Sequence, residues 1–380
     1  MGGRKLTQAK NAKIDEFYTQ WEVIEKEVQA YLEYDPNVFR GKTILLPCDD
    51  PEWSNFTKFF ALHFQEYGLK KLISTSYAPE SKAYKTHYQT TLFEENSPKF
   101  DKTKTKINGK IFILSEDSNS DGKIDIDDLK WDYLNGDGDF RSKEVLKLRD
   151  EADIIVTNPP FSLFREFLMW ITKANKQFLI IGNMNAVVYK EVFPLIAENR
   201  IWFGPSITNG DRVFNVPDDF PLYAAGCGID KDGKKYIKVK GVRWFTNLDH
   251  GRRHQPIPLM SLTDNLKFSK HKEIKGKTTY DKYDNYCAIE IPFTDAIPSD
   301  YEGVMGVPIS FLDKYCPEQF EIIWQASGCT RASAPKDVLK EVEYRQHSID
   351  RGGYPVVDKE KRLYHRILIR LKEQSYENDA

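Results

Sequence analysis

The apolar run Asp153-Ile154-Ile155-Val156-Thr157 leads directly into Asn158-Pro159-Pro160-Phe161, and this junction constrains the fold more than any other feature of the chain. A short run rich in β-branched residues predicts a buried parallel strand, and neither a strand nor a helix continues through two successive prolines. The chain must therefore turn sharply where the strand ends. Because proline fixes φ, the turn holds Asn158 and the Pro159 carbonyl stiffly at an edge where open α/β sheets bind ligands.

This turn has the chemistry needed to bind an amino group on a planar ring. Such a group has two hydrogens to donate, and Asn158 Oδ1 and the Pro159 carbonyl supply two acceptors. Accepting both hydrogens localises the nitrogen lone pair towards an electrophile, while Phe161 offers a ring on which a base can stack. We therefore expect a methyl-transfer site in which Asn158, Pro159, Pro160 and Phe161 hold the acceptor. The alternative is a Pro-Pro loop that merely ends an ordinary strand.

Strand and helix patterns alternate through the first half of the chain. A helical pattern runs to about Tyr34, and further helices are expected after the first strand, after the Pro-Pro turn and near residues 188–198. This rhythm predicts a doubly wound, Rossmann-like α/β sheet that is mostly parallel. Residues 110–114 are expected to belong to a hairpin-like insertion. The expected core strands are residues 43–47, 69–74, 153–157, 178–182 and 200–203.

The alternation weakens beyond Gly204, where proline, glycine, aspartate and basic residues become frequent. We therefore expect residues 1–205 to form an N-terminal helix and the catalytic core. Residues 206–380 are expected to form a smaller target-recognition region, together with carboxyl-terminal elements that complete the core. A chain of 380 residues is long enough for such a two-part organisation.

Composition narrows the class of protein. The formal net charge of −2 gives no global positive field, so any surface for nucleic acid has to be local. The 5 cysteines are odd in number and contain no CxxC pair, which argues against a disulfide framework and against a zinc site. No apolar stretch approaches the ~20 residues of a membrane span. These features favour a soluble cytoplasmic protein without a membrane partner.

A methyl donor needs a pocket at the carboxyl ends of the first strands, where a carboxylate can bind hydroxyl or ammonium groups. Asp49 or Asp50 occupies such a position, although the usual Gly-x-Gly turn is absent and a solvated turn is the alternative. Asp139 and Phe140 form a second candidate, in which the carboxylate binds an adenine amino group and the ring packs on the purine. A polar Gly-Asp turn is the alternative here.

Several motifs together resemble the EcoRI-type adenine-specific DNA methyltransferases. They appear in the family's order from about Lys13 to Arg370, so the resemblance covers nearly the whole chain. The motifs are residues 15–20 (DEFYTQ), 48–51 (CDDP), 136–142 (GDGDFRS), 157–166 (TNPPFSLFRE), 244–249 (WFTNLD), 303–308 (GVMGVP) and 366–369 (RILI).

The resemblance implies S-adenosylmethionine as methyl donor and the amino group of adenine in double-stranded DNA as acceptor, in a restriction-modification system. It implies that Asn158, Pro159 and Phe161 hold the target base. No metal or covalent intermediate is required, since alignment allows direct displacement. The base must leave the duplex to be reached. A monomer is expected, without a stable complex with a partner restriction endonuclease. The implied cofactor-binding residues are Phe17, Tyr18, Cys48, Asp49, Asp50, Asp139 and Phe140.

Two basic stretches are candidates for DNA contact. Arg252 and Arg253 lie beside a family-like motif, and Lys270 and Lys272 belong to a lysine-rich run that is equally consistent with a solvated loop. Lysine contacts phosphate without reading sequence, whereas arginine can bridge guanine edges. Arg141 and Arg165 flank the candidate catalytic motifs and either position phosphate or brace the loop.

Residues 116–128 depart from the family pattern and include the spacing of an EF-hand calcium loop. Position twelve is Asp128 rather than glutamate, and no clear amphipathic helix precedes the loop, so a solvated acidic insertion is the alternative.

Two other functions of the whole protein remain open. The same corner suits RNA adenine or a protein glutamine amide, and a non-catalytic DNA-binding or calcium-binding protein could retain the fold.

Overall fold

The computed structural model describes residues 19–47, 49, 54–78, 97–208, 211–216, 222 and 226–373. The chain divides into two compact units, of which the first contains residues 1–183 and 209–249 and the second contains residues 184–208 and 250–380. This division differs from the single boundary expected at residue 205, because the chain returns to the first unit after the boundary. The returning strand, β11 (Val242–Thr246), pairs with β6 (Gln177–Asn183).

The main sheet of the first unit has a parallel centre and antiparallel edges. Its strands are ordered β4-β3-β2-β1-β5-β6-β11. β1 is parallel to β2 and β5, and β5 is parallel to β6, whereas β3, β4 and β11 run antiparallel to their neighbours. The remaining strands are β1 (Thr43–Leu46), β2 (Lys71–Thr75), β3 (Lys110–Leu114), β4 (Lys130–Tyr133) and β5 (Ile154–Thr157).

Residues 110–114 were expected in a hairpin-like insertion, and they do belong to a hairpin that lies in the chain between β2 and β5. They form β3, which extends the main sheet by pairing antiparallel with β2 and then forms a hairpin with β4. The alternate residues of β3 are buried while those between them are half-buried, which is the pattern of a strand near a sheet edge. In contrast, every residue of β1 and β5 is buried, as expected for central parallel strands.

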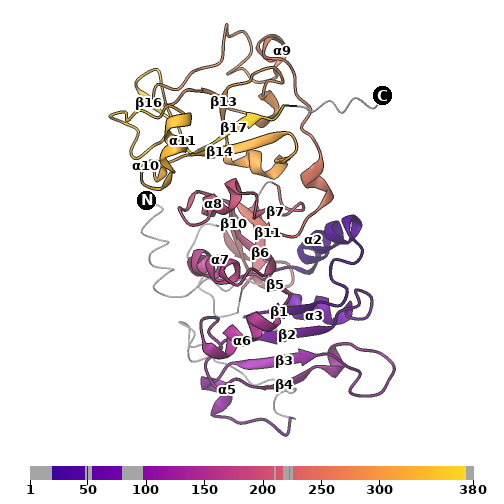
Figure 1. Cartoon of the computed structure of the whole chain (residues 1–380). Helices are drawn as coiled ribbons and strands as arrows, with labels where there is room; N and C mark the ends of the chain where they lie inside the picture. Colours follow the sequence, from indigo (N-terminus) through magenta and orange to yellow (C-terminus); the bar gives the residue numbers. More distant parts are fainter. Residues whose placement is uncertain are drawn as a thin grey trace. The chain divides into compact units, whose positions relative to one another are not determined.

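Helices cover both faces of this sheet (Figure 1). α2 and α3 lie on one side, while α6 and α7 lie on the other. This arrangement follows from right-handed crossovers, because the chain moves outward from β1 to β2 and in the opposite direction from β5 to β6. The helices of the first unit are α2 (Trp21–Tyr34), α3 (Asn55–Leu62), α5 (Lys104–Ile107), α6 (Lys143–Glu151) and α7 (Phe164–Lys173), with short 3-10 turns at Ile126–Asp128 and Phe161–Leu163.

A small antiparallel sheet also belongs to the first unit. Its strand order is β8-β10-β9, and it lies in the sequence before β11. The strands are β8 (Asp211–Asn215), β9 (Cys227–Ile229) and β10 (Lys235–Lys240).

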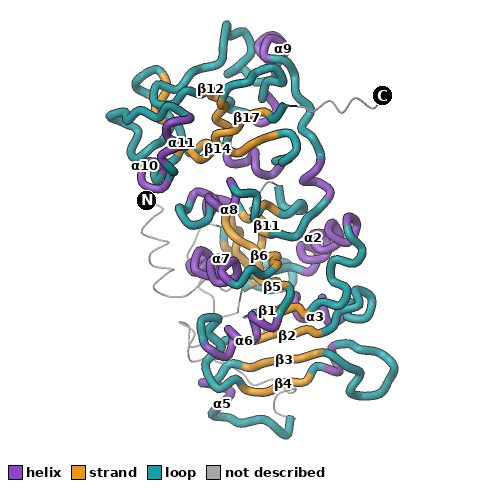
Figure 2. The backbone as a smooth tube through the Cα atoms, viewed as in Figure 1, coloured by secondary structure: helices purple, strands orange, loops and turns teal. Residues whose placement is uncertain are grey.

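The second unit contains a four-stranded sheet with the order β12-β13-β17-β14. β12 is parallel to β13, and β17 pairs antiparallel with both β13 and β14. Figure 2 shows how much of this unit is loop. Its strands are β7 (Trp202–Phe203), β12 (Ala288–Glu290), β13 (Val304–Val307), β14 (Phe320–Ala326), β15 (Val356–Val357), β16 (Lys361–Arg362) and β17 (Arg366–Leu371). Its helices are α8 (Phe193–Ala197), α9 (Leu262–Phe268), α10 (Thr330–Ser333) and α11 (Lys336–Glu341), with 3-10 turns at Met184–Val188, Gly251–His254, Thr294–Ala296 and Ile309–Lys314.

Among the described residues, no helix is long and apolar enough to cross a membrane. The described cysteines, Cys227, Cys287, Cys316 and Cys329, are all free thiols.

Candidate active site

The order of the central strands defines a topological switch point between β1 and β5. From β1 the chain winds outward through β2, and it later returns to place β5 on the other side of β1. Because β1 and β5 are parallel, with Leu45 opposite Ile155, their carboxyl ends meet at the same edge of the sheet. The Thr157 hydroxyl donates a 3.0 Å hydrogen bond to the Pro47 carbonyl and ties the two ends together. Open α/β sheets bind ligands at such an edge.

Asp49 follows β1 at this edge and is held rigidly. The residue is 7% exposed, and its Oδ1 accepts a 2.7 Å hydrogen bond from the Ser54 hydroxyl. Ser54 is also the N-cap of α3, where its oxygen accepts a hydrogen bond from the Phe56 N–H. The Asp49 carbonyl accepts a 3.1 Å hydrogen bond from the Thr57 hydroxyl. The sequence therefore folds into a strand, a turn and a capped helix that hold one carboxylate at the switch point.

The loop that carries Asp139 lies against the carboxyl end of β2. The Ala78 N–H donates a 2.8 Å hydrogen bond to the Asp137 carbonyl. Gly138 has a φ of +83°, and a Cβ at this position would collide with the Ser76 carbonyl oxygen. Only glycine allows this close approach. As β2 is the neighbour of β1, the loop brings Asp139 to the same sheet edge as Asp49 and Asn158.

Asp139 and Phe140 have different surroundings. Asp139 accepts hydrogen bonds from Arg141 Nε at 2.8 Å and Nη2 at 2.6 Å, and this carboxylate is the main reason why the pKa of Arg141 is raised. Phe140 is 3% exposed, and its ring packs edge-on against Phe167 and Trp170 at centroid distances of 5.1 and 5.6 Å. The ring of Phe140 therefore anchors the loop to the core. Its stacking on a purine stays a prediction.

The acceptor motif forms the sharp turn that its prolines dictate. β5 ends at Thr157, and a 3-10 turn spans Phe161–Leu163 before α7 begins. Pro159 is buried, while Asn158 and Phe161 are half-buried. Phe161 contacts Phe214 of the small sheet, with ring centroids 6.3 Å apart and the planes perpendicular. Phe214 is 2% exposed.

Sequence reasoning missed Phe214 as a neighbour of the acceptor motif. It lies in Asp211–Asn215, beyond the point where the strand and helix rhythm weakens. The period-two spacing of Phe214 and Val216 was the available signal. Nothing local to it indicates contact with Phe161, because the two residues are brought together only by the fold.

Four candidate cofactor residues, Phe17, Tyr18, Cys48 and Asp50, lie outside the described residues. Their roles stay predictions.

Of the candidate residues that the structure describes, Asp49, Asp139 and Asn158 come to the same edge of the main sheet.

The candidate DNA-contacting residues are distributed over both units. Arg141 pairs with Asp139 and with Glu166 at 3.3 Å, and Arg165 is exposed on α7 of the same unit. In the second unit, Lys270 forms a 2.7 Å ion pair with Asp295.

Arg252 and Arg253 differ in exposure. Arg252 is half-buried and donates a 2.8 Å hydrogen bond to the Pro205 carbonyl. The other candidate lysine of this unit, Lys272, is exposed. Arg253 is 8% exposed, with its guanidinium 3.8 Å from the centre of the Trp202 ring. This geometry gives Arg253 a packing role within the second unit, and its contact with DNA stays a prediction.

The acidic insertion folds onto itself. Asp128 is 2% exposed and accepts hydrogen bonds from the N–H groups of Ser118, Asn119 and Asp125 at 2.7, 3.1 and 3.1 Å. The carboxylate at the twelfth position of the EF-hand spacing is thus directed at the loop's own backbone. Within the part of the chain that the structure describes, no group of three or more His, Cys, Asp or Glu side chains is placed to hold a metal ion.

Residues 5–372 match the family model described as adenine-specific methyltransferase EcoRI. The chain belongs to this family. It is 43% identical to the type II methyltransferase M.EcoRI of Escherichia coli over 318 residues, which cover 84% of this chain and 88% of that protein. It is 34% identical to the type II methyltransferase M.MpnI of Mycoplasma pneumoniae over 371 residues, which cover 97% and 98% of the two chains.

The chain is also 34% identical to the type II methyltransferase M.MgeORF184P of Mycoplasma genitalium over 371 residues, which cover 97% of this chain and 99% of that protein. No solved structure matches the chain. The chain is therefore an adenine-specific methyltransferase, an enzyme that takes its methyl group from a donor. The family that its motifs indicated is confirmed.

Proposed function

We propose that this methyltransferase transfers a methyl group from S-adenosylmethionine to the exocyclic N6 amino group of adenine at a specific site in double-stranded DNA. The modification would protect DNA from a partner restriction endonuclease. The observation that carries the proposal is the position of Asn158. The Asn-Pro-Pro-Phe turn lies at the switch point of the sheet in a chain of the adenine-specific family. A cytoplasmic monomer that forms no stable complex with the endonuclease fits this role.

The residues beside the switch point fit the proposed donor. The almost fully buried carboxylate of Asp49 suits the hydroxyl or ammonium groups of S-adenosylmethionine, and its bond to Ser54 fixes its direction. Asp139 would bind the donor's adenine amino group, and Phe140 keeps the loop of Asp139 in place. Phe17, Tyr18, Cys48 and Asp50 complete the proposed cofactor site. When bound, the donor supplies an activated methyl group on a sulfonium centre.

The acceptor base would be held by the rigid turn after β5. Asn158 Oδ1 and the Pro159 carbonyl accept the two hydrogens of the amino group, so its lone pair is directed out of the base plane. Phe161 provides the ring on which the adenine stacks, and Phe214 packs against Phe161. Because the amino group is paired inside a duplex, the base must first be swung out, which costs a few kcal/mol of unstacking. Alignment then allows direct displacement at the methyl carbon.

Two other acceptors fit the same corner, an adenine in RNA and the amide of a protein glutamine. Each presents a planar NH2 group that needs two acceptors. The match over nearly the whole chain to an adenine-specific family favours adenine over glutamine. DNA and RNA are distinguished by experiment.

The direct test uses the purified full chain with donor labelled in its methyl group. Duplex DNA, a duplex RNA of the same sequence and a protein extract are offered separately. We expect label only in DNA, recovered as N6-methyladenine, and sequencing of the methylated bases then gives the recognition site. Label in RNA or protein with none in DNA adenine would overturn the proposal.

A further inference from the structure

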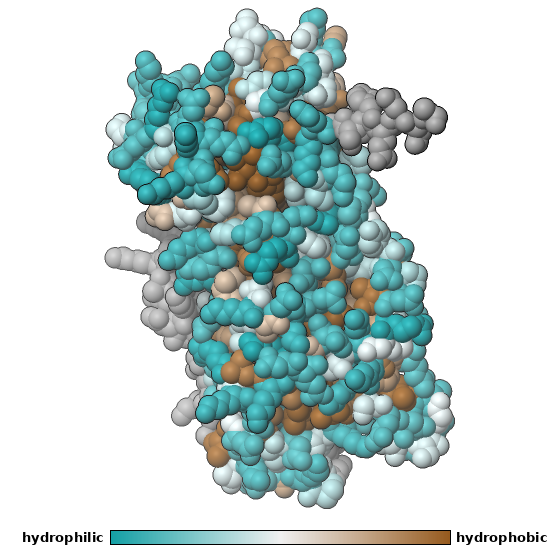
Figure 3. Space-filling model, viewed as in Figure 1, coloured by the Kyte–Doolittle hydropathy of each residue, from teal (hydrophilic) through white to brown (hydrophobic). Residues whose placement is uncertain are grey.

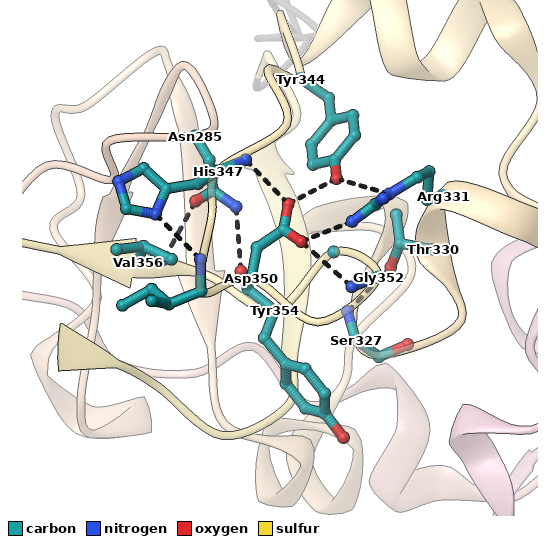
Figure 4. Close-up of polar contacts among 12 residues, drawn as sticks. Asn285, Ser327, Thr330, Arg331, Tyr344, His347, Asp350, Gly352, Tyr354 and Val356 are labelled. Carbon is teal, nitrogen blue, oxygen red and sulfur yellow. Dashed lines mark hydrogen bonds and ion pairs between the residues drawn. The ribbon is translucent and has the colours of Figure 1, made fainter. Parts of the chain in front are cut away.

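A buried carboxylate organises the loop that precedes the β15–β16 hairpin of the second unit (Figure 4). The side chain of Asp350 is fully buried, and it accepts hydrogen bonds from Arg331 Nη2 and the Tyr344 hydroxyl, both at 2.6 Å. The backbone N–H groups of His347 and Gly352 donate to it at 3.1 and 3.0 Å. Burial by itself would raise the pKa of this carboxyl, but these donors and the Arg331 charge lower it below its ordinary value. Asp350 therefore stays ionised and fixes both sides of its loop.

Asn285 holds the same loop from the opposite side (Figure 4). It is 1% exposed, its Nδ2 donates to the Tyr354 carbonyl at 2.9 Å, and its Oδ1 accepts from the Val356 N–H at 3.0 Å. The Asn285 carbonyl accepts from the Arg345 N–H at 3.0 Å. The loop and the β15–β16 hairpin that follows it are thus fixed to the β12 region at several points.

Two glycines allow the loop to approach the α10 turn closely. Gly352 and Gly353 have φ values of +100° and +127°, and a Cβ at Gly352 would collide with the Gly328 carbonyl oxygen. The Arg331 N–H donates a 2.9 Å hydrogen bond to the Gly352 carbonyl. This packing adds to the Asp350 and Asn285 contacts, so the backbone of residues 344–357 is held in one conformation.

This rigid frame presents cations to solvent. Arg345 has a side chain that is 79% exposed, and it forms a 3.2 Å surface ion pair with Glu343. Arg351, Lys359 and Lys361 are exposed and form no ion pair with any residue that the structure describes. Tyr364 is 62% exposed. We call Arg345, Arg351, Lys359, Lys361 and Arg362 the hairpin surface.

Residues 344–364 contain five Lys or Arg and three Asp or Glu, a net charge of +2, whereas the whole chain has a net charge of −2. Between residues 344 and 364 the acidic side chains are Asp350, which is neutralised internally by Arg331, and the exposed Asp358 and Glu360. Figure 3 shows mainly hydrophilic residues over this part of the second unit. The surface is therefore suited to an anionic partner.

We propose that the hairpin surface binds duplex DNA, an inference that rests on the proposed function. β15 and β16 form a two-stranded ribbon, with Val356 opposite Arg362, and such a ribbon fits the major groove, which is about 12 Å wide. Lys361 and Arg362 lie in β16 and Lys359 lies in the turn before it, so exposed cations of the ribbon can neutralise phosphates. Because the frame is already ordered, binding requires little further ordering of the loop. The sequence alone did not single out these residues.

The test compares the wild-type full chain with the triple variant Arg351→Ala/Lys361→Ala/Arg362→Ala. The probe is a fluorescein-labelled duplex of about 25 base pairs carrying a sequence that the wild type methylates, with anisotropy measured over a range of salt concentrations. We expect the Kd to rise about tenfold and the slope of log K against log salt to become shallower by about 0.9 for each phosphate that the variant no longer neutralises. Binding of the methyl donor alone should be unchanged.

The matched control removes the same charge from exposed lysines of the first unit, Lys102→Ala/Lys106→Ala/Lys123→Ala. If the hairpin variant binds DNA as the wild type does, or if the control weakens binding equally, the inference is wrong while the proposed function stands. If the wild type methylates no DNA adenine, the proposed function fails and this inference fails with it. The double variant Arg351→Lys/Arg362→Lys should retain most of the affinity, because lysine preserves the phosphate contacts.

Discussion

The hydroxyl of Thr157, the last residue of β5, donates a 3.0 Å hydrogen bond to the carbonyl of Pro47, the residue after β1. Thr157 is fully buried. This bond joins the two chain segments that carry the candidate donor-binding and acceptor-binding residues. Since Asp49 comes two residues after Pro47 and Asn158 comes directly after Thr157, this bond helps to fix the position of Asp49 relative to Asn158.

The first prediction concerns this bond. Thr157→Val keeps the shape of the side chain but leaves a buried carbonyl without its donor, which costs about 1–3 kcal/mol. We expect a lower melting temperature and reduced methyl transfer, measured by thermal unfolding and by incorporation of labelled methyl groups. Thr157→Ser retains the hydroxyl and should be close to the wild type. Equal stability of the valine variant and the wild type would show that the bond contributes nothing.

The second prediction concerns Asn158. Asn158→Ala removes an acceptor that is directed at the substrate rather than at the donor, so we expect kcat to fall by roughly 10²-fold or more. Donor affinity, measured by calorimetry on the free enzyme, should change less than about twofold. Asn158→Asp keeps oxygen acceptors at this position and should have activity between the two. Full activity in the alanine variant would remove the proposed mechanism.

The third prediction concerns Phe214 as a positioning residue. Its ring contacts Phe161 edge-on at 6.3 Å, and Phe214→Leu replaces this aromatic contact with a smaller, flexible side chain. We expect kcat to fall by about tenfold while the Kd for DNA stays nearly constant. A duplex with 2-aminopurine at the target position should show less fluorescence from the flipped base.

The matched variant for this position is Phe214→Tyr, which keeps the ring and should retain activity. If Phe214→Leu lowers the melting temperature but leaves kcat and the 2-aminopurine signal at wild-type levels, the contact with Phe161 is only structural.

The fourth prediction concerns the buried ion pair between Glu290 and Arg366. Their side chains are 8% and 14% exposed, and Arg366 Nη2 lies 2.6 Å from Glu290 Oε1. The Tyr283 hydroxyl also donates to Glu290, and burial together with the Glu290 charge raises the pKa of Tyr283 well above its ordinary value, so the donor proton is retained. Glu290→Ala leaves a buried cation unpaired and should destabilise the second unit by about 3–5 kcal/mol.

Denaturant unfolding measures this loss, and the double variant Glu290→Ala/Arg366→Met should recover part of it, because the unpaired cation is then absent. A double variant that is no more stable than Glu290→Ala would contradict an electrostatic origin of the loss.

The fifth prediction concerns pH. Burial, with a contribution from the neighbouring Arg366 charge, lowers the pKa of His365 from 6.5 to about 4. The unfolded chain therefore takes up a proton at a higher pH than the folded chain, and stability is full above about pH 6.5 and is lost as the pH falls towards 4. Because the ring is partly exposed, we expect a modest effect, about 2 °C in the melting temperature between pH 7.5 and 5.

His365→Gln removes this titration, so the variant should lose less stability than the wild type over the same pH range. Identical pH profiles of the wild type and the variant would show that other groups cause the acid sensitivity.

Much of the first unit is predictable from local sequence. The apolar runs of β1, β5 and β6 and the spacing of Phe164, Phe167 and Ile171 in α7 each carry their own signal, because burial of one face or of both faces fixes which residues can be apolar. The hairpin that contains β3 was expected, but its alternating pattern did not indicate that β3 pairs with β2 and so joins the main sheet.

The candidate site was predictable to the extent that its residues follow strands. Asp49 and Asn158 come after β1 and β5, and parallel pairing places them at one edge. The burial of Phe140 was not predictable, because its ring packs on Phe167 and Trp170 from a later helix. The burial of Arg253 was not predictable either, because it packs on Trp202, which is about 50 residues away in the sequence.

The sequence by itself determined the turn at Asn158, the strands that precede it and the family to which the chain belongs, because proline geometry and hydrophobic pattern act over a few residues. Only the tertiary structure decided that Phe214 contacts Phe161, that β11 returns to pair with β6, and that Asp350 joins its loop to Arg331. These contacts join segments whose local patterns carry no record of their partners. They form only when the packing of the whole chain brings distant residues together.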